Sequence, residues 1–263
     1  MVPLLEYACE LWDGCNVQDI NKIEQIQNEA ARIVTGLPKF ASIESLYFET
    51  GWETLESRRR RRKLGLFYKI HNGNCPLYLQ DCLGTFRYYR QRHLRNDSDY
   101  RIPFTRLQLF SSSFFPSSIR QWNNLQPEFR NLPTIEHFKK ALSSNDHIKP
   151  PTYYSIGNRY LNILHTRIRH RCSSLKADLF RCNIVNDPAC ACGWVVEDAI
   201  HFLLECNLFY RAREQLKDNL SFLREIEIET LLFGNDNLSI ELNRTIFKSV
   251  QWYIKETKRF DMH

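Results

Sequence analysis

The sequence predicts a mainly α-helical protein with a small β-strand insertion (α+β), and three observations support this fold class. Apolar residues recur at three- and four-residue steps over residues 17–35, as is typical of an amphipathic helix. The helical period is lost over residues 86–116, where β-favouring residues predict two or three short strands. Residues 143–152 contain Asn145-Asp146 and Pro150-Pro151, a composition that is typical of a linker.

The remaining elements follow from periodicity and from start and stop residues. Gly36 and Pro38 end the first helix, and Ser42 and Gly51 bound the second. Further helices are expected over residues 54–71, 76–83, 117–124, 135–142, 156–170, 175–180, 197–204, 208–223 and 243–258. The predicted domains are a helical region over 1–84, a mixed strand and helix region over 85–148, and a helical module over 153–263.

Composition narrows the class of protein. Hydrophobic residues make up 43% of the 263 residues, enough to build a folded core. No apolar run approaches the roughly 18 to 20 residues that span a bilayer, and no signal peptide is visible at Met1. We therefore expect no membrane partner and an intracellular location, in the cytoplasm, the nucleus or both. The 9 cysteines are then expected to be thiols or metal ligands.

Positive charge is concentrated in one part of the chain. Between Arg58 and Arg106 there are 13 Lys and Arg against 3 Asp and Glu. Such a block is typical of a protein with a polyanionic partner, here RNA or DNA, although a solvated helix face or a nuclear-import signal gives the same pattern. The candidate phosphate-binding residues of the first run are Arg58, Arg59, Arg60, Arg61, Arg62 and Lys63.

A second basic segment interleaves cations with aromatic residues. This combination favours charge neutralisation together with stacking on unpaired bases. Its candidate binding residues are Arg87, Tyr88, Arg90, Arg92 and Arg95. A third candidate surface contains Arg167, Arg169 and Arg171, which are spaced by two and would fan out on a helix.

Cysteine and histidine residues near the C-terminus have metal-ligand spacing. Cys190, Cys192, His201 and Cys206 follow the pattern C-x-C-x8-H-x4-C, which matches the closed donor set of a structural Zn²⁺ site. Gly193 would permit the tight turn between the first two ligands and the chain that follows. Residues five apart on an ideal helix diverge by roughly 140°, so His201 and Cys206 can share an ion only if the helix ends or distorts between them.

Two alternatives to this ligand set remain open. The three thiols and the histidine could instead be buried core residues. Cys172, Cys182 and His170 are close enough in sequence to be substitute ligands. No arrangement typical of a catalytic zinc is present, because no H-E-x-x-H pattern occurs.

Three segments of the chain carry motifs. The first is Leu5-Glu6-Tyr7-Ala8 with Trp12 and Ile20-x-x-Ile23-Glu24-x-Ile26-Gln27-x-x-Ala30-Ala31-Arg32. The second is Ser113-Phe114-Phe115-Pro116-x-x-Ile119-Arg120-x-Trp122-Asn123-x-Leu125 with Phe138-Lys139, and the third is Cys190-x-Cys192-Gly193, Glu197-Asp198, His201-Phe202-Leu203-Leu204-x-Cys206 with Arg211 or Arg213. In this order, the three segments resemble the region after the palm in non-LTR (jockey- and chicken-repeat-like) retrotransposon reverse transcriptases. The resemblance implies a helical thumb-like part and a C-terminal Cys/His module.

The resemblance also implies RNA-directed DNA synthesis, but this chain lacks the Asp-Asp motif through which the family performs it. The family is an RNA-directed DNA polymerase whose palm carries an Asp-Asp pair, and this sequence contains none. We therefore expect a nucleic-acid-binding C-terminal fragment without catalysis of its own. Its expected partners are the element transcript or target DNA, and the catalytic part of a reverse transcriptase is a further candidate. A protein-interaction scaffold and a non-functional retroelement remnant are the alternatives.

Overall fold

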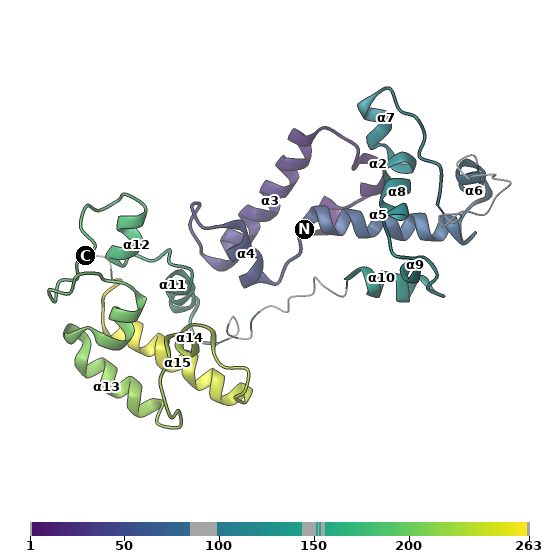
Figure 1. Cartoon of the computed structure of the whole chain (residues 1–263). Coiled ribbons are helices and arrows are strands. Elements are labelled where there is room, and N and C mark those ends of the chain that lie inside the picture. Colours follow the sequence, from purple (N-terminus) through teal and green to yellow (C-terminus); the bar gives the residue numbers. More distant parts are fainter. Residues whose placement is uncertain (1, 85–98, 144–150, 152, 154–155, 262–263) are drawn as a thin grey trace. The chain divides into compact units, whose positions relative to one another are not determined.

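The computed structural model describes residues 2–84, 99–143, 151, 153 and 156–261, and these residues contain helices and no strand element. The chain forms two compact units, and each is assembled from two separate segments (Figure 1). Unit 1 contains Met1–Asn28 and Trp52–Ile148, and unit 2 contains Glu29–Gly51 and Lys149–His263. The long helix α3 (Val17–Thr35) contributes residues to both units, whereas the predicted ranges 1–84, 85–148 and 153–263 follow the chain order. No described helix is long and apolar enough to cross a membrane.

Unit 1 is built around the helix α5 (Leu55–His71). The hydroxyl oxygen of Thr54 caps its first turn by accepting a hydrogen bond from the backbone N–H of Ser57. Helices α2, α6, α8 and α10 pack against α5. The other helices of unit 1 are α1 (Val2–Leu5), α2 (Cys9–Trp12), α6 (Leu77–Gly84), α7 (Gln108–Ser112), α8 (Phe114–Asn123), α9 (Pro127–Arg130) and α10 (Ile135–Ser143).

Aromatic rings fill the core of unit 1. Trp122 is fully buried, and its ring lies 5.1 Å from the ring of Phe67 and 5.8 Å from that of Phe138. Phe67 and Tyr68 follow Leu64 by three and four residues, so the three side chains share one face of α5. This apolar stripe fixes α8 and α10 on one side of α5 and leaves the other faces of α5 to its cations.

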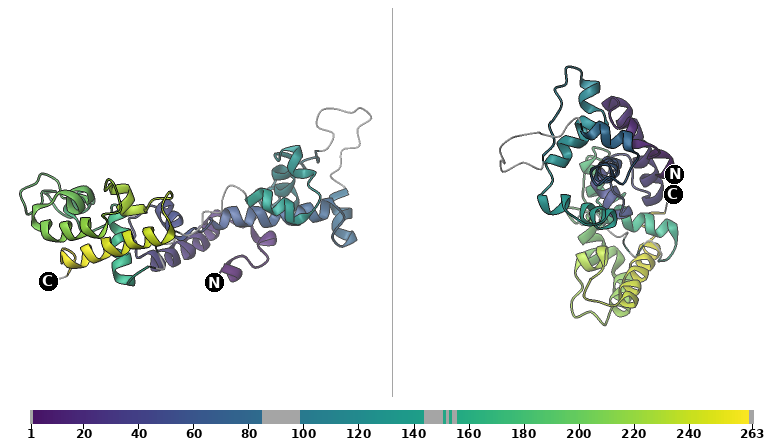
Figure 2. Two further views of the ribbon diagram at one scale, coloured as in Figure 1. Left: turned by 90° about the horizontal axis from the view of Figure 1, so that it is seen from below. Right: turned by 90° about the vertical axis from the view of Figure 1, so that its right-hand side faces the viewer.

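Unit 2 is built around the C-terminal helix α15 (Ile240–Glu256). Helices α11, α13 and α14 pack against it, and Figure 2 shows α15 in yellow beside the green helices. Val250, Tyr253 and Ile254 carry the buried face of α15. The other helices are α4 (Ile43–Thr50), α11 (Arg159–Arg169), α12 (Lys176–Arg181), η2 (His201–Glu205), η3 (Asn207–Phe209), α13 (Tyr210–Asn219) and α14 (Ile228–Phe233).

The predicted strands over 86–116 are wrong for the described part of that segment. Residues 85–98 lie outside the described residues; of the rest, 108–112 form helix α7 and α8 begins at Phe114. Phe104, Leu107 and Leu109 are exposed, so they do not pack as one face of a sheet. The β-preference of such residues reflects packing on a paired, half-buried surface. Without a partner strand, the same residue types do not form a sheet.

Candidate metal centre

The four predicted metal ligands meet in one cluster within unit 2. The thiol sulfurs of Cys190, Cys192 and Cys206 and a ring nitrogen of His201 all lie within 4.8 Å of one another. The Sγ atoms of Cys190 and Cys206 are 3.7 Å apart, and Cys192 Sγ is 3.2 Å from His201 Nε2. Sulfurs bound at about 2.3 Å to a tetrahedral ion are separated by roughly 3.8 Å. The cluster can therefore hold a metal ion, and the 3.7 Å separation is too long for a disulfide of about 2.05 Å.

A tight turn brings the first two ligands to the cluster. Gly193 has a φ of 91°, which L-residues with a Cβ rarely adopt. Its backbone N–H donates to the carbonyl oxygen of Cys190 at 3.0 Å, and the N–H of Cys190 donates to the carbonyl oxygen of Trp194 at 2.9 Å. The expected role of Gly193 in closing the turn is confirmed.

A helical distortion brings the last two ligands together. The segment His201–Glu205 is a π-helix, and the backbone N–H of Cys206 donates to the carbonyl oxygen of His201 at 2.7 Å, five residues earlier. The wider turn places residues five apart closer to the same side than an α-helix does. At Cys206 the backbone leaves helical geometry, with ψ of 120°. The predicted distortion between His201 and Cys206 is thus confirmed.

Three of the four residues of the cluster are buried from solvent. Cys190, His201 and Cys206 are at most 5% exposed. Burial, together with the neighbouring Cys190 thiol, raises the pKa of Cys206 to about 12, so the bare site disfavours its thiolate. A bound cation would reverse this preference, because it stabilises the thiolate directly. Four protein ligands leave no coordination position for a substrate, which is typical of a structural site.

Residues beyond the four ligands support the histidine and the last cysteine. The ring of Trp194 stacks on the imidazole of His201 with centroids 5.5 Å apart and planes within 4°. The guanidinium of Arg213, which is 5% exposed, donates to the carbonyl oxygen of Cys206 at 2.8 Å. Three thiolates and one divalent ion carry a net charge of −1, which this arginine partly offsets. The resemblance named Arg211 or Arg213 without choosing between them, and in the structure Arg213 is the one that contacts Cys206.

Glu205 is the residue that we expect to tune the metal affinity. With Nε2 of His201 facing Cys192, the buried Nδ1 atom makes no hydrogen bond within the described chain, and Glu205 Oε2 lies 3.6 Å from it, just beyond hydrogen-bond distance. A carboxylate behind a ligating histidine orients the ring and raises its basicity. The variant Glu205→Ala is expected to weaken metal binding about ten-fold or more, measured by competition with a chromogenic chelator. Glu214→Ala, on the exposed face of α13, serves as the control, and equal affinities for the two variants would contradict this role.

The three substitute ligands lie elsewhere. His170 Nε2 contacts Glu49 Oε1 at 2.6 Å, and the thiol of Cys172 donates to the carbonyl oxygen of His170 at 3.2 Å. Neither residue, nor Cys182, belongs to the metal cluster. These three residues therefore do not replace any of the four predicted ligands in this structure.

The basic run on α5 is engaged by acidic residues of unit 1. The guanidinium of Arg59 is 2% exposed and contacts Asp13 at 3.0 Å and Glu24 at 3.3 Å. Arg61 forms a two-pronged pair with Glu53, at 2.5 and 2.6 Å. The remaining pairs are Arg58 with Glu6, Arg62 with Glu6 and Glu10, and Lys63 with Asp13. Among the described residues of this run, Arg60 alone is exposed without an acidic partner.

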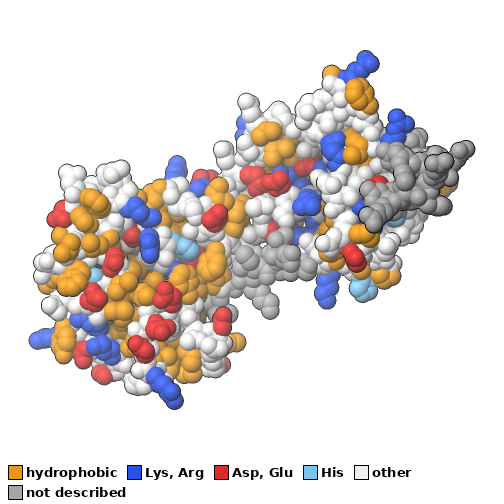
Figure 3. All heavy atoms as spheres, in the orientation of Figure 1, with side chains coloured by type: hydrophobic (Ala, Val, Ile, Leu, Met, Phe, Trp, Pro, Cys, Tyr) orange, Lys and Arg blue, Asp and Glu red, His pale blue; other side chains and the backbone are white. Residues whose placement is uncertain are grey.

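Helical spacing explains this pairing. Arg58 and Arg62 are four residues apart on α5 and therefore lie on one side of it, where they meet Glu6 in the turn before α2 and Glu10 in α2. In Figure 3, acidic side chains lie among the basic ones on the visible face. The signal was present in the sequence as acidic residues at helical spacing, but they precede the basic block by about 50 positions.

The other predicted nucleic-acid contacts fall into two groups. Arg87, Tyr88, Arg90, Arg92 and Arg95 lie outside the described residues. In unit 2, Arg167 donates to the carbonyl oxygen of Gly36 at 2.9 Å, Arg169 is buried against Glu49, and Arg171 is exposed beyond the end of α11. These three arginines therefore point to separate environments, as their spacing by two predicts.

Comparison with protein-family models, with curated proteins and with solved structures finds no match to this chain.

Proposed function

We propose that this chain is a nucleic-acid-binding protein without polymerase activity of its own, and that a structural Zn²⁺ ion holds its C-terminal module together. The observation that carries the proposal is the cluster of Cys190, Cys192, His201 and Cys206. These residues are the Cys/His motif that resembles the C-terminal module of non-LTR retrotransposon reverse transcriptases. The nucleic-acid partner would be the element transcript or target DNA.

Zinc fits the donor set better than the other common ions. Three thiolates and an imidazole suit a borderline-soft ion with tetrahedral geometry, whereas Mg²⁺ and Ca²⁺ take oxygen ligands. The buried, closed arrangement favours a structural ion over a catalytic one. In this proposal the ion fixes the loop and the π-turn against the core of unit 2, and the protein surface makes the nucleic-acid contacts.

The binding surface is expected to use cations that have no acidic partner in the described chain. Among the described residues of the run on α5, Arg60 alone is left for that role, because burial and ion pairs occupy the others. Replacing the whole run with alanine would therefore disrupt the fold as well as any contact. A single change, Arg60→Ala, tests the contact without removing an ion pair.

The purified chain is expected to bind single-stranded RNA or DNA with a clear salt dependence. Three or four phosphate contacts on a single strand lower the affinity roughly 20- to 50-fold between about 50 and 200 mM salt. Fluorescence anisotropy of a labelled oligonucleotide measures the slope. An affinity that does not change with salt, or no binding at low salt, would refute nucleic-acid binding.

A protein-interaction scaffold is the second candidate, and one observation favours it. Phe104, Leu107 and Leu109 are 71 to 83% exposed in the segment that leads into and begins helix α7 of unit 1. Exposed apolar side chains close together mark partner surfaces on many proteins. Under this alternative, charged substitutions at these three positions abolish partner docking, whereas Arg60→Ala leaves it unchanged.

A further inference from the structure

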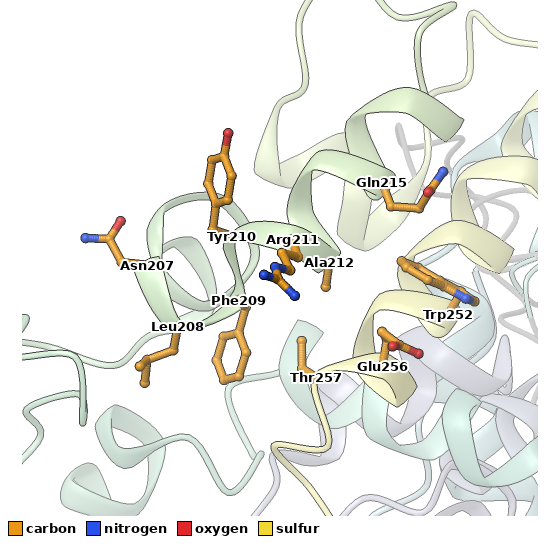
Figure 4. A pocket seen from close by; sticks show the side chains of 10 residues that line it. All are labelled: Asn207, Leu208, Phe209, Tyr210, Arg211, Ala212, Gln215, Trp252, Glu256 and Thr257. Atoms are coloured by element: carbon orange, nitrogen blue, oxygen red, sulfur yellow. The ribbon is translucent and has the colours of Figure 1, made fainter.

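A pocket in unit 2 opens between the start of α13 and the end of α15. Its volume of about 570 Å³ lies within the roughly 300 to 1,000 Å³ of small-molecule sites. In Figure 4, Leu208, Phe209 and Tyr210 lie on one side, Trp252 and Glu256 lie on the other, and Arg211 lies between them. The pocket begins at Asn207, the residue after the last metal ligand, so the metal-bound segment positions one wall.

The pocket combines exposed aromatic rings with an unpaired cation. Trp252 is 36% exposed and Tyr210 is 58% exposed, so both rings are accessible from solvent. Arg211 is exposed, and no described acidic residue forms an ion pair with it. Arg211 therefore resembles Arg60 and differs from Arg58, Arg59, Arg61 and Arg62 of α5, whose charges are paired with acidic residues within the protein. An accessible guanidinium beside stacking rings is suited to a ligand that carries both a flat base and a phosphate.

Helix α15 extends the same chemistry along its exposed face. Arg244, Lys248 and Trp252 follow one another at steps of four, and Lys255 follows Trp252 by three. These steps place the four side chains on one side of the helix, opposite the buried Val250 and Tyr253. Within the described chain, none of the three cations is engaged in an ion pair. The row therefore has free positive charge on both sides of the tryptophan.

We propose that this pocket binds an unpaired nucleotide of a single-stranded nucleic acid, an inference that rests on the proposed nucleic-acid-binding function. The base stacks on Trp252, and Arg211 and Lys248 contact the flanking phosphates. Glu256 repels phosphate and accepts hydrogen bonds from N–H groups, so the edge of the base faces it. Neutralisation of phosphates by the row on α15 makes the pocket complementary to a strand rather than to a free apolar ligand.

The test compares three pocket variants of the full chain with the unaltered chain in binding a labelled single-stranded oligonucleotide of about 12 residues, prepared as DNA and as RNA. Trp252→Ala and Arg211→Ala are each expected to weaken binding about ten-fold, because each removes a stacking or charge contact. Trp252→Phe keeps a stacking ring and is expected to restore most of the affinity. A duplex of the same length is expected to bind with no dependence on Trp252, since its bases are already stacked.

Matched controls separate this proposal from the function on which it rests. Phe222 and Arg224 are an exposed ring and an exposed cation of unit 2 outside the pocket, so Phe222→Ala and Arg224→Ala should bind as the unaltered chain does. Metal content and thermal melting establish that every variant is folded. If the unaltered chain binds and the pocket variants bind equally well, the pocket proposal is overturned and nucleic-acid binding stands. If the unaltered chain does not bind, the proposed function itself fails.

Discussion

Removal of the proposed structural metal ion is expected to unfold the part of unit 2 that contains Cys190, Cys192, His201 and Cys206. Apparent binding energies of structural Zn²⁺ in small modules, about 10–16 kcal/mol, are comparable to the whole stability of a typical domain. Phe202 and Leu203 lie between His201 and Cys206 and are at most 1% exposed, so loss of the ion removes the anchor of two core residues. A chelator should therefore reduce the helical circular dichroism signal and expose this segment to proteolysis.

Metal analysis and a pair of cysteine variants complete this test. The purified chain is expected to contain close to one zinc per molecule, and Cys206→Ser should lose the ion and melt at a lower temperature. Cys182→Ser is the matched control, because Cys182 is a free thiol of the same unit outside the cluster. A chain that contains no metal and keeps its melting temperature in chelator would exclude a structural ion.

Substitution of Glu49 is expected to destabilise unit 2 by about 3–5 kcal/mol, because the substitution leaves a buried charge without its partner. The side chains of Glu49 and Arg169 are at most 1% exposed, and their atoms approach to 2.8 Å. Glu49 also accepts hydrogen bonds from His170 at 2.6 Å and from the hydroxyl of Tyr153 at 3.1 Å. The guanidinium of Arg169 lies 3.9 Å from the ring centroid of Tyr153.

The free energy of unfolding of Glu49→Ala is measured by urea denaturation and compared with that of the unaltered chain. Thermal melting of unit 2 is a second measurement of the same effect. The double variant Glu49→Leu with Arg169→Met removes both charges and is expected to recover most of the lost stability. Glu214→Ala, which breaks the exposed pair with Lys217, should cost less than about 1 kcal/mol. A loss for Glu49→Ala no larger than that of Glu214→Ala would mean that the buried network contributes little to stability.

Local features of this protein were predictable from local sequence. The helix bounds of α4 follow from Ser42, which caps it, and Gly51, which ends it with a φ of 64°. The distortion between His201 and Cys206 followed from helix geometry alone, because a spacing of five cannot aim two ligands at one ion without it. In each case the interacting residues lie within a few positions of one another, so the spacing itself carries the information.

The features that the sequence left undetermined depend on distant partners. The β-favouring residues near Phe104 predicted strands, but strand formation requires a paired neighbour that the spacing of one segment does not specify. The composition of unit 2 is a second case. The segment that contains α4 packs in one unit with residues that follow it by more than 90 positions. Pairing of such segments is decided by which apolar faces are buried together.

The amino-acid sequence by itself determined most of the longer helices, the four Cys and His residues that cluster in unit 2 and the absence of an Asp-Asp pair, because each is encoded in a short stretch of chain. Only the tertiary structure decided which positive charges remain available for an external anion. Arg59 meets Asp13 from 46 positions away and Arg62 meets Glu10 from 52 positions away, whereas Arg211 and Lys248 meet no acid in the described chain. An ion pair depends on the distance between two side chains in space, and that distance is established only when the helices pack.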